Sequence, residues 1–101
     1  MNAQTHTVNE QDVQQAWAAM PEAFRTTHPL PVDRTWQAGQ AWSTKVRRDC
    51  KAIIVVMLDT ATADLARGDL DSSRIVHAEV RPFERLKRVL DAVEAQQGAR
   101  A

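Results

Sequence analysis

The residue types in this chain that are best suited to chemistry are a single cysteine and three histidines. Basic side chains close to a thiol lower its pKa and make it a nucleophile. The chain places three of them next to Cys50: Arg47, Arg48 and Lys51. Cys50 also falls on an apolar stripe between Val46 and Ile53, and a free cysteine is usually buried. We therefore expect Cys50 to be a packing residue.

The histidines do not form a site with any other residue of the sequence. His6, His28 and His77 lie far apart, and none has a second metal ligand at helical spacing. The carboxylates between Asp64 and Asp71 lack the alternating ligands and distant glutamate of a calcium loop. We find no glycine-rich phosphate loop and no serine–histidine–aspartate set. The sequence thus predicts no catalytic, cofactor-binding or metal-binding residue, and a protein that is not an enzyme.

Two clusters of basic residues, at 45–51 and 81–88, are candidates for contacts with an anionic partner. On a helix, Arg81 would lie near Arg85 and Arg88, where the three could contact phosphates. The alternative is a solvated helix face with internal ion pairs, such as Glu84 to Arg88. We expect the solvated face, because the chain is neutral overall and carries no recognisable DNA-binding motif.

Three of the five aromatic residues are tryptophans, which are enriched at the energetic centres of protein interfaces. Trp36 and Trp42 are six residues apart, about 240° around a helix, so they cannot share the centre of one stripe. They are either core anchors or interface anchors. The candidate partner-binding residues are Trp36, Trp42, Arg47, Arg48, Arg81, Arg85 and Arg88.

A short helix is expected near the N-terminus, after a flexible tail over residues 1–8. Asn9 is a good N-cap, and Val13, Trp17 and Met20 share one helical face. A proline-rich connector follows over residues 21–32, with one helical turn around Glu22 to Arg25. We expect residues 9–98 to form a single helical domain.

A long central helix is predicted over residues 34–67, where Gly39 is the only glycine and proline is absent. Its apolar stripe includes Val46, Ile53 and Met57, and Gly68 is placed to end it. Such a helix would be about 50 Å long, more than a compact domain of this size can enclose. It therefore breaks, at Gly39, or projects and finds a partner.

The last element predicted is a C-terminal amphipathic helix that ends at Gly98. Its stripe contains Phe83, Leu86, Leu90 and Val93, and the helix starts either at Pro82 or at Ser73 with a kink. The fold class is therefore mostly α. The alternative is a small α+β domain with strands near 52–58 and 74–80, where β-branched residues gather.

Composition favours a small cytoplasmic protein. The chain has 101 residues, 13 basic and 13 acidic, and its longest apolar run, Ala52–Leu58, is too short to cross a membrane. Sixteen of the apolar residues are alanine, so the core is thin and a homodimer is plausible. We expect a non-catalytic interaction protein: a regulator, adaptor or inhibitor of bacterial type that docks to another protein. The alternative is a nucleic-acid-binding regulator that uses the two basic clusters.

Overall fold

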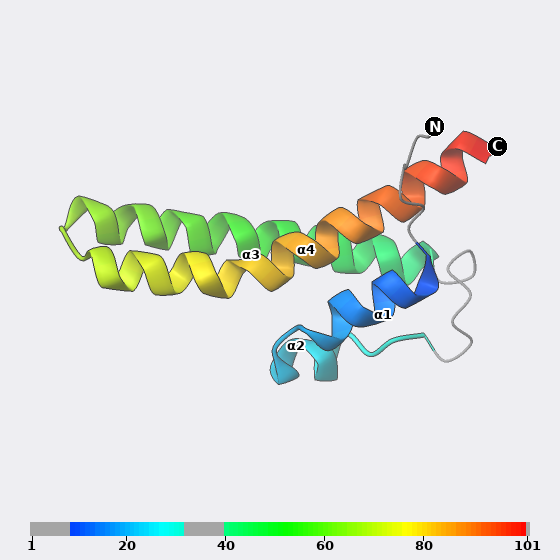
Figure 1. Ribbon diagram of the computed structural model, residues 1–101, viewed down its shortest axis with the longest axis horizontal. Helices are drawn as coiled ribbons and strands as arrows, with labels where there is room; N and C mark the ends of the chain where they lie inside the picture. The colour runs from blue at the N-terminus through cyan, green and yellow to red at the C-terminus, as the bar shows by residue number, and fades with distance from the viewer. Residues whose placement is uncertain (1–8, 32–39, 101) are drawn as a thin grey trace, which may run out of the picture.

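The computed structural model describes residues 9–31 and 40–100, and within them the chain forms four helices and no strand. These are α1 (Glu10–Ala18), α2 (Glu22–Thr27), α3 (Gln40–Ala66) and α4 (Leu70–Arg100). The mostly α fold class is confirmed. Two long helices run side by side in opposite directions, and the two short ones pack at one end of them (Figure 1).

The N-terminal helix begins as its sequence predicts. Asn9 and Asp12 form a capping box, in which the Asp12 amide donates to Asn9 Oδ1 and the Asn9 amide donates to Asp12 Oδ2. Pro21 separates α1 from α2 and starts the short second helix, which extends two residues beyond the predicted turn, to Thr27. Both helices bury apolar side chains against the long pair.

The alternative α+β prediction is wrong, because segments 52–58 and 74–80 lie inside α3 and α4. The β-branched run is helical because Ile53 and Ile54 pack against the core from within a long helix, and tertiary packing overrides local propensity. In the second segment, the residues that alternate along the chain include Val76 and Val80. These two are also four apart and share a helical face.

The C-terminal helix is longer than expected at both ends. It starts at Leu70, runs through Pro82, and continues past Gly98 to Arg100, so the prediction that Gly98 ends it is wrong. Proline at position 82 provides no N–H for the Ala78 carbonyl, which weakens the helix there. In Figure 1, α4 changes direction near its middle, as expected for an interior proline. For the central helix, residues 34–39 lie outside the described part of the chain, as do 1–8.

A three-residue turn reverses the chain between the long helices. Gly68 has φ +78° and donates to the Leu65 carbonyl, while the Asp69 amide donates to the Asp64 carbonyl at 2.8 Å. This pair of bonds is a Schellman motif, which satisfies carbonyls at the end of α3. Asp69 then caps α4 by accepting from the Ser72 amide and hydroxyl. A short glycine-containing turn thus joins α3 and α4 as an antiparallel hairpin.

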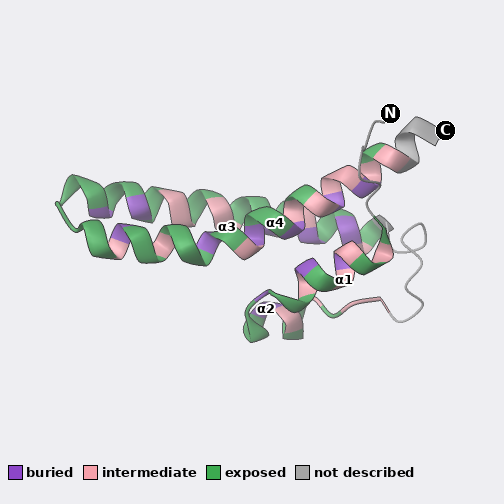
Figure 2. Cartoon of the chain, in the orientation of Figure 1, coloured by how far each residue is buried: buried purple, intermediate pink, exposed green. Residues whose placement is uncertain are grey.

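The apolar core lies at one end of this hairpin, which we call the base. There α1 and α2 cover the long helices, and their side chains form one cluster: Val13, Ala16, Met20, Phe24, Val46, Cys50, Phe83, Leu86, Leu90 and Val93. We call the uncovered end, residues 52–66 and 70–81, the arm. Its buried residues are few and mostly small: Ala61, Asp64, Ser73 and Val80. Figure 2 shows this contrast between the base and the arm.

Helix length sets the shape of the molecule. With 27 and 31 residues, α3 and α4 are about 40 and 46 Å long, whereas α1 and α2 have 9 and 6 residues. The extents are 48 × 38 × 20 Å and the radius of gyration is 15.7 Å. A compact domain of this size would have a radius near 13 Å. From Gln40 to Ala66 the central helix is therefore continuous and projects from the core, while the predicted break at Gly39 lies outside the described residues.

Replacing the turn glycine should cost stability through backbone strain alone. A Cβ at position 68 would meet no atom within 4 Å, but the positive φ disfavours alanine. We expect Gly68→Ala to lower the free energy of unfolding by about 1 kcal/mol in urea titrations. Gly68→Asn, which tolerates this conformation better, should lose less; equal losses would contradict the assignment.

Candidate functional site

Cys50 lies in the core, as predicted, and it is fully buried. Burial raises the pKa of its thiol to about 11, and the nearby charge of Asp49 adds to the effect. The neighbouring basic residues do not reverse this shift. At neutral pH the Cys50 thiol is therefore protonated and enclosed, which are the properties of a packing residue.

His28 links the N-terminal helices to α3 rather than lying free on a connector. Its ring stacks on Phe24 with centroids 4.0 Å apart, and its carbonyl accepts a 2.7 Å hydrogen bond from Trp17 Nε1. On α3, Asp49 Oδ2 lies 2.7 Å from His28 Nε2 and also 2.7 Å from Lys45 Nζ. The imidazole thus joins α2 to α3, and the His28 carbonyl adds the bond to α1, so that this one residue fixes both short helices on the base.

Asp49 is the anionic centre of this network. Hydrogen bonds from Lys45 and then from His28 lower the pKa of its carboxyl from 3.8 to about 2. Arg48 lies farther away, with Nε 3.8 Å from Asp49 Oδ1, and its side chain is largely exposed. The carboxylate therefore stabilises the folded state as long as it remains ionised.

Arg47 is occupied within the fold. Its guanidinium reaches from α3 to two carboxylates on α4, Asp91 at 3.3 Å and Glu94. Asp91 also pairs with Lys87 at 2.7 Å. Arg47 therefore fastens the two long helices together at the base, and most of the charge in the first basic cluster is balanced internally.

The second basic cluster is different, because its arginines are exposed and converge. Arg81, Arg85 and Arg88 line a hollow of ≈ 440 Å³ between α4 and the end of α1. Its other walls include Ala19 and Glu84. No acidic side chain in the described part of the chain forms an ion pair with any of these three arginines. The expected Glu84–Arg88 pair is not formed.

Two of the tryptophans, Trp17 and Trp42, contribute to the base rather than to the arm. Trp42 is half-buried and packs against the core together with Trp17. Trp36 lies outside the described residues. Of the predicted partner-binding residues, the structure therefore brings Arg81, Arg85 and Arg88 together, and it places Trp42 and Arg47 in the packing of the base.

Exposed apolar side chains on the arm were not anticipated from the sequence. Within the described residues, the large hydrophobic side chains that are exposed all lie on the arm, with 49–64% of their surface accessible: Val55, Val56, Leu65, Leu70 and Ile75. A signal was present, because seven consecutive apolar residues at 52–58 cannot all face one side of a helix. Some of that run had to face outward.

A hollow of ≈ 460 Å³ continues this surface towards the base. It lies where the turn between α1 and α2 meets the arm, and its walls are Ala19, Pro21, Met57, Glu79, Pro82 and Phe83. Apolar side chains therefore extend from the arm into the corner beside α2. The arm, with its exposed large hydrophobic residues, is the candidate docking surface.

The described residues lack the features of a metal site and of a membrane span. His77 is exposed, and its Nδ1 lies 2.9 Å from the Ser73 carbonyl of its own helix. No group of three or more histidine, cysteine or acidic residues in the described ranges is arranged to hold a metal ion. None of the helices described is long and apolar enough to span a bilayer.

No protein-family model, curated protein or solved structure matches this chain. The site must therefore be interpreted from its own geometry.

Burial of Cys50 predicts slow modification of its thiol. In the native protein we expect alkylation by iodoacetamide to be slower than in urea-unfolded protein by about a hundredfold or more, because the thiol must first be exposed by unfolding. Mass spectrometry over time measures both rates. Similar rates in the two states would contradict the burial of Cys50.

Acid should lower the free energy of unfolding, partly because it protonates the Asp49 carboxylate. Because its folded pKa is depressed, its contribution is present above pH 4 and is lost as the pH falls towards 2. We expect Asp49→Asn to lose about 1 kcal/mol at pH 7 and to show a shallower fall in stability between pH 4 and 2. Urea titrations at several pH values test this, with Asp59→Asn, an exposed position on the same helix, as the control. Parallel pH profiles for wild type and Asp49→Asn would contradict it.

Proposed function

We propose that this protein is a non-catalytic docking module, a small regulator, adaptor or inhibitor, whose arm binds another protein. The observation that carries the proposal is the location of the exposed large hydrophobic residues. All of those in the described residues lie on the part of the hairpin that α1 and α2 leave uncovered. Large apolar side chains left exposed on one part of a molecule are a feature of protein-interaction sites.

The arm is also suited mechanically to docking. Its helices are continuous with those of the base, where ion pairs and the apolar core fix their positions. A partner would therefore meet a surface whose backbone is already ordered, and binding would cost little conformational entropy.

A second candidate function is nucleic-acid binding, favoured by one observation. Arg81, Arg85 and Arg88 are exposed around one hollow and have no ion-pair partner among the described residues. The first basic cluster supports this function less, since Lys45 and Arg47 are held in ion pairs. Protein docking accounts for the exposed apolar residues as well, so we place it first and propose that it takes place in the cytoplasm.

Crosslinking from defined positions tests the docking proposal. A photoreactive benzoylphenylalanine placed at Leu65 or Ile75 should crosslink one discrete protein in the source cell. The same group at Gln15 or Ala23, which are exposed on α1 and α2, should not. Ultraviolet-dependent bands identified by mass spectrometry provide the measurement.

The mass of the crosslinked product distinguishes a second copy of this chain from a different protein. A crosslinked product of twice the chain's own mass would identify the partner as a second copy, the homodimer suggested by the thin core. Crosslinks that form equally from α1 and from the arm, or none from the arm, would overturn the proposal.

A further inference from the structure

The unpaired arginines of α4 lie along one side of the arm and the adjoining part of the base. Arg74, Arg81 and Arg88 are seven residues apart, so they recur on the same side of the helix at steps of about 10 Å. Arg85 lies between the last two. All four are exposed, and none has an ion-pair partner within the described residues. We call these four residues the arginine row.

A row of apolar residues follows the same side of the hairpin. On α3, Leu58 and Leu65 each come one position after a residue that faces α4, namely Met57 and Asp64. On α4, Arg74 and Arg81 likewise follow inward-facing residues, Ser73 and Val80.

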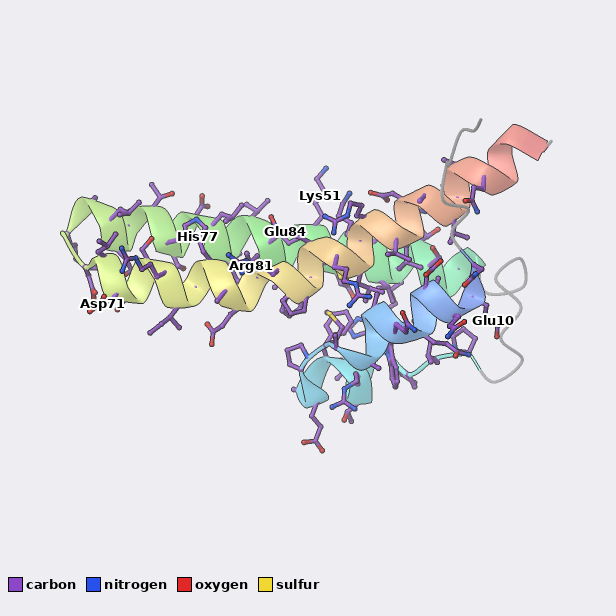
Figure 3. The ribbon with its side chains drawn as sticks, viewed as in Figure 1. Glu10, Lys51, Asp71, His77, Arg81 and Glu84 are labelled. Atoms are coloured by element: carbon purple, nitrogen blue, oxygen red, sulfur yellow. The ribbon has the colours of Figure 1, made fainter. Side chains whose placement is uncertain are left out.

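Each residue of a helix is rotated by about 100° around the axis from the residue before it. Because α3 and α4 are antiparallel, a residue that directly follows an inward-facing residue lies on the same side of the hairpin in both helices. The leucines and the arginine row therefore share one side. Leu70, four residues before Arg74, joins them. Lys51, which follows Cys50, extends away from α1 and α2 (Figure 3). Ala19, at the end of α1, borders the row where it lines the hollow with the arginines, whereas Leu65 and Leu70 are exposed on the arm.

We propose that this side of the hairpin binds an acidic amphipathic helix of a partner protein. This inference rests on the proposed docking function and names its partner's chemistry. An apolar stripe on the partner would cover Leu58, Leu65 and Leu70, and carboxylates repeating every seven residues would meet the arginine row. Arginine and carboxylate pair through charge-assisted hydrogen bonds, which would fix the register of the two helices.

Charge argues against two other occupants of this side. Between Arg74 and Arg81 the carboxylate is Glu79, which precedes Val80 and so lies on the opposite side of the hairpin, while Glu84 lines the same hollow as Arg81 and Arg88. One glutamate against four arginines leaves the row net positive, so two copies that met through this side would repel each other. Nucleic acid would satisfy the arginines, but it would leave Leu65 and Leu70 half-exposed.

A designed peptide provides the probe. It has three heptads, with leucine on one stripe and glutamate at each flanking position, and a matched peptide carries lysine in place of glutamate. By fluorescence anisotropy we expect the acidic peptide to bind at least about tenfold more tightly than the basic one. A duplex DNA of similar length, measured in the same buffer, is the nucleic-acid probe.

Two double variants with the same change in net charge test where on the protein the peptide binds. Arg81→Gln with Arg88→Gln should weaken binding of the acidic peptide by about tenfold. Gln11→Glu with Gln15→Glu, the same change in net charge placed on α1, should leave it within about twofold. Leu65→Ser with Leu70→Ser should also weaken it. Circular dichroism establishes that each variant remains helical.

Several results would overturn this inference. They are equal affinity for the two peptides, an unchanged affinity in the arginine variant, or tighter binding of the duplex with no effect of the leucine variant. Crosslinking from the arm to a protein in cells, together with failure of the acidic peptide, would refute this inference and leave the docking function standing. An arm that crosslinks nothing would refute the docking function itself.

Discussion

The N-terminal helices are too short to cover the hairpin, and the rest of the structure follows from this mismatch. Helices of 9 and 6 residues can bury apolar surface only along one end of helices with 27 and 31 residues. The core therefore forms at the base, where Phe24 and Val13 meet Leu86 and Leu90. The arm keeps a narrow interior and exposes apolar residues for which this chain provides no cover in its described part.

The ion pairs, like the apolar contacts, differ between the base and the arm. At the base, Arg47 and His28 are used to join helices, and their carboxylate partners come from elements far away in sequence. Towards the arm, Arg74, Arg81, Arg85 and Arg88 of α4 form no ion pair with any residue in the described part of the chain. A neutral chain thus presents an uneven surface: its paired charges hold the base together, and its unpaired ones lie beside exposed leucines. Such an arrangement favours selective association over indiscriminate binding.

The sequence predicted most of the helices because their signals are local. Helix ends are marked by the side-chain cap of Asn9, by Pro21, and by the positive φ of Gly68. The apolar stripe through Leu86 and Leu90 has a clear helical period. The two strands proposed as an alternative failed because β-branched residues adopt helical angles when neighbouring helices supply the packing. The exposed arm could not be located from the sequence, because exposure depends on how far α1 and α2 extend over the long helices. The role of His28 was missed for the same reason, because its partner Asp49 is 21 residues away.

Hydrogen exchange, read by mass spectrometry on the free protein and on the protein bound to its captured partner, tests the central claim most directly. The account predicts that binding slows exchange chiefly in residues 52–66 and 70–81, while α1 and α2 change little. Protection confined to α1, α2 or the base, with the arm exchanging as fast in the complex as in the free protein, would contradict it.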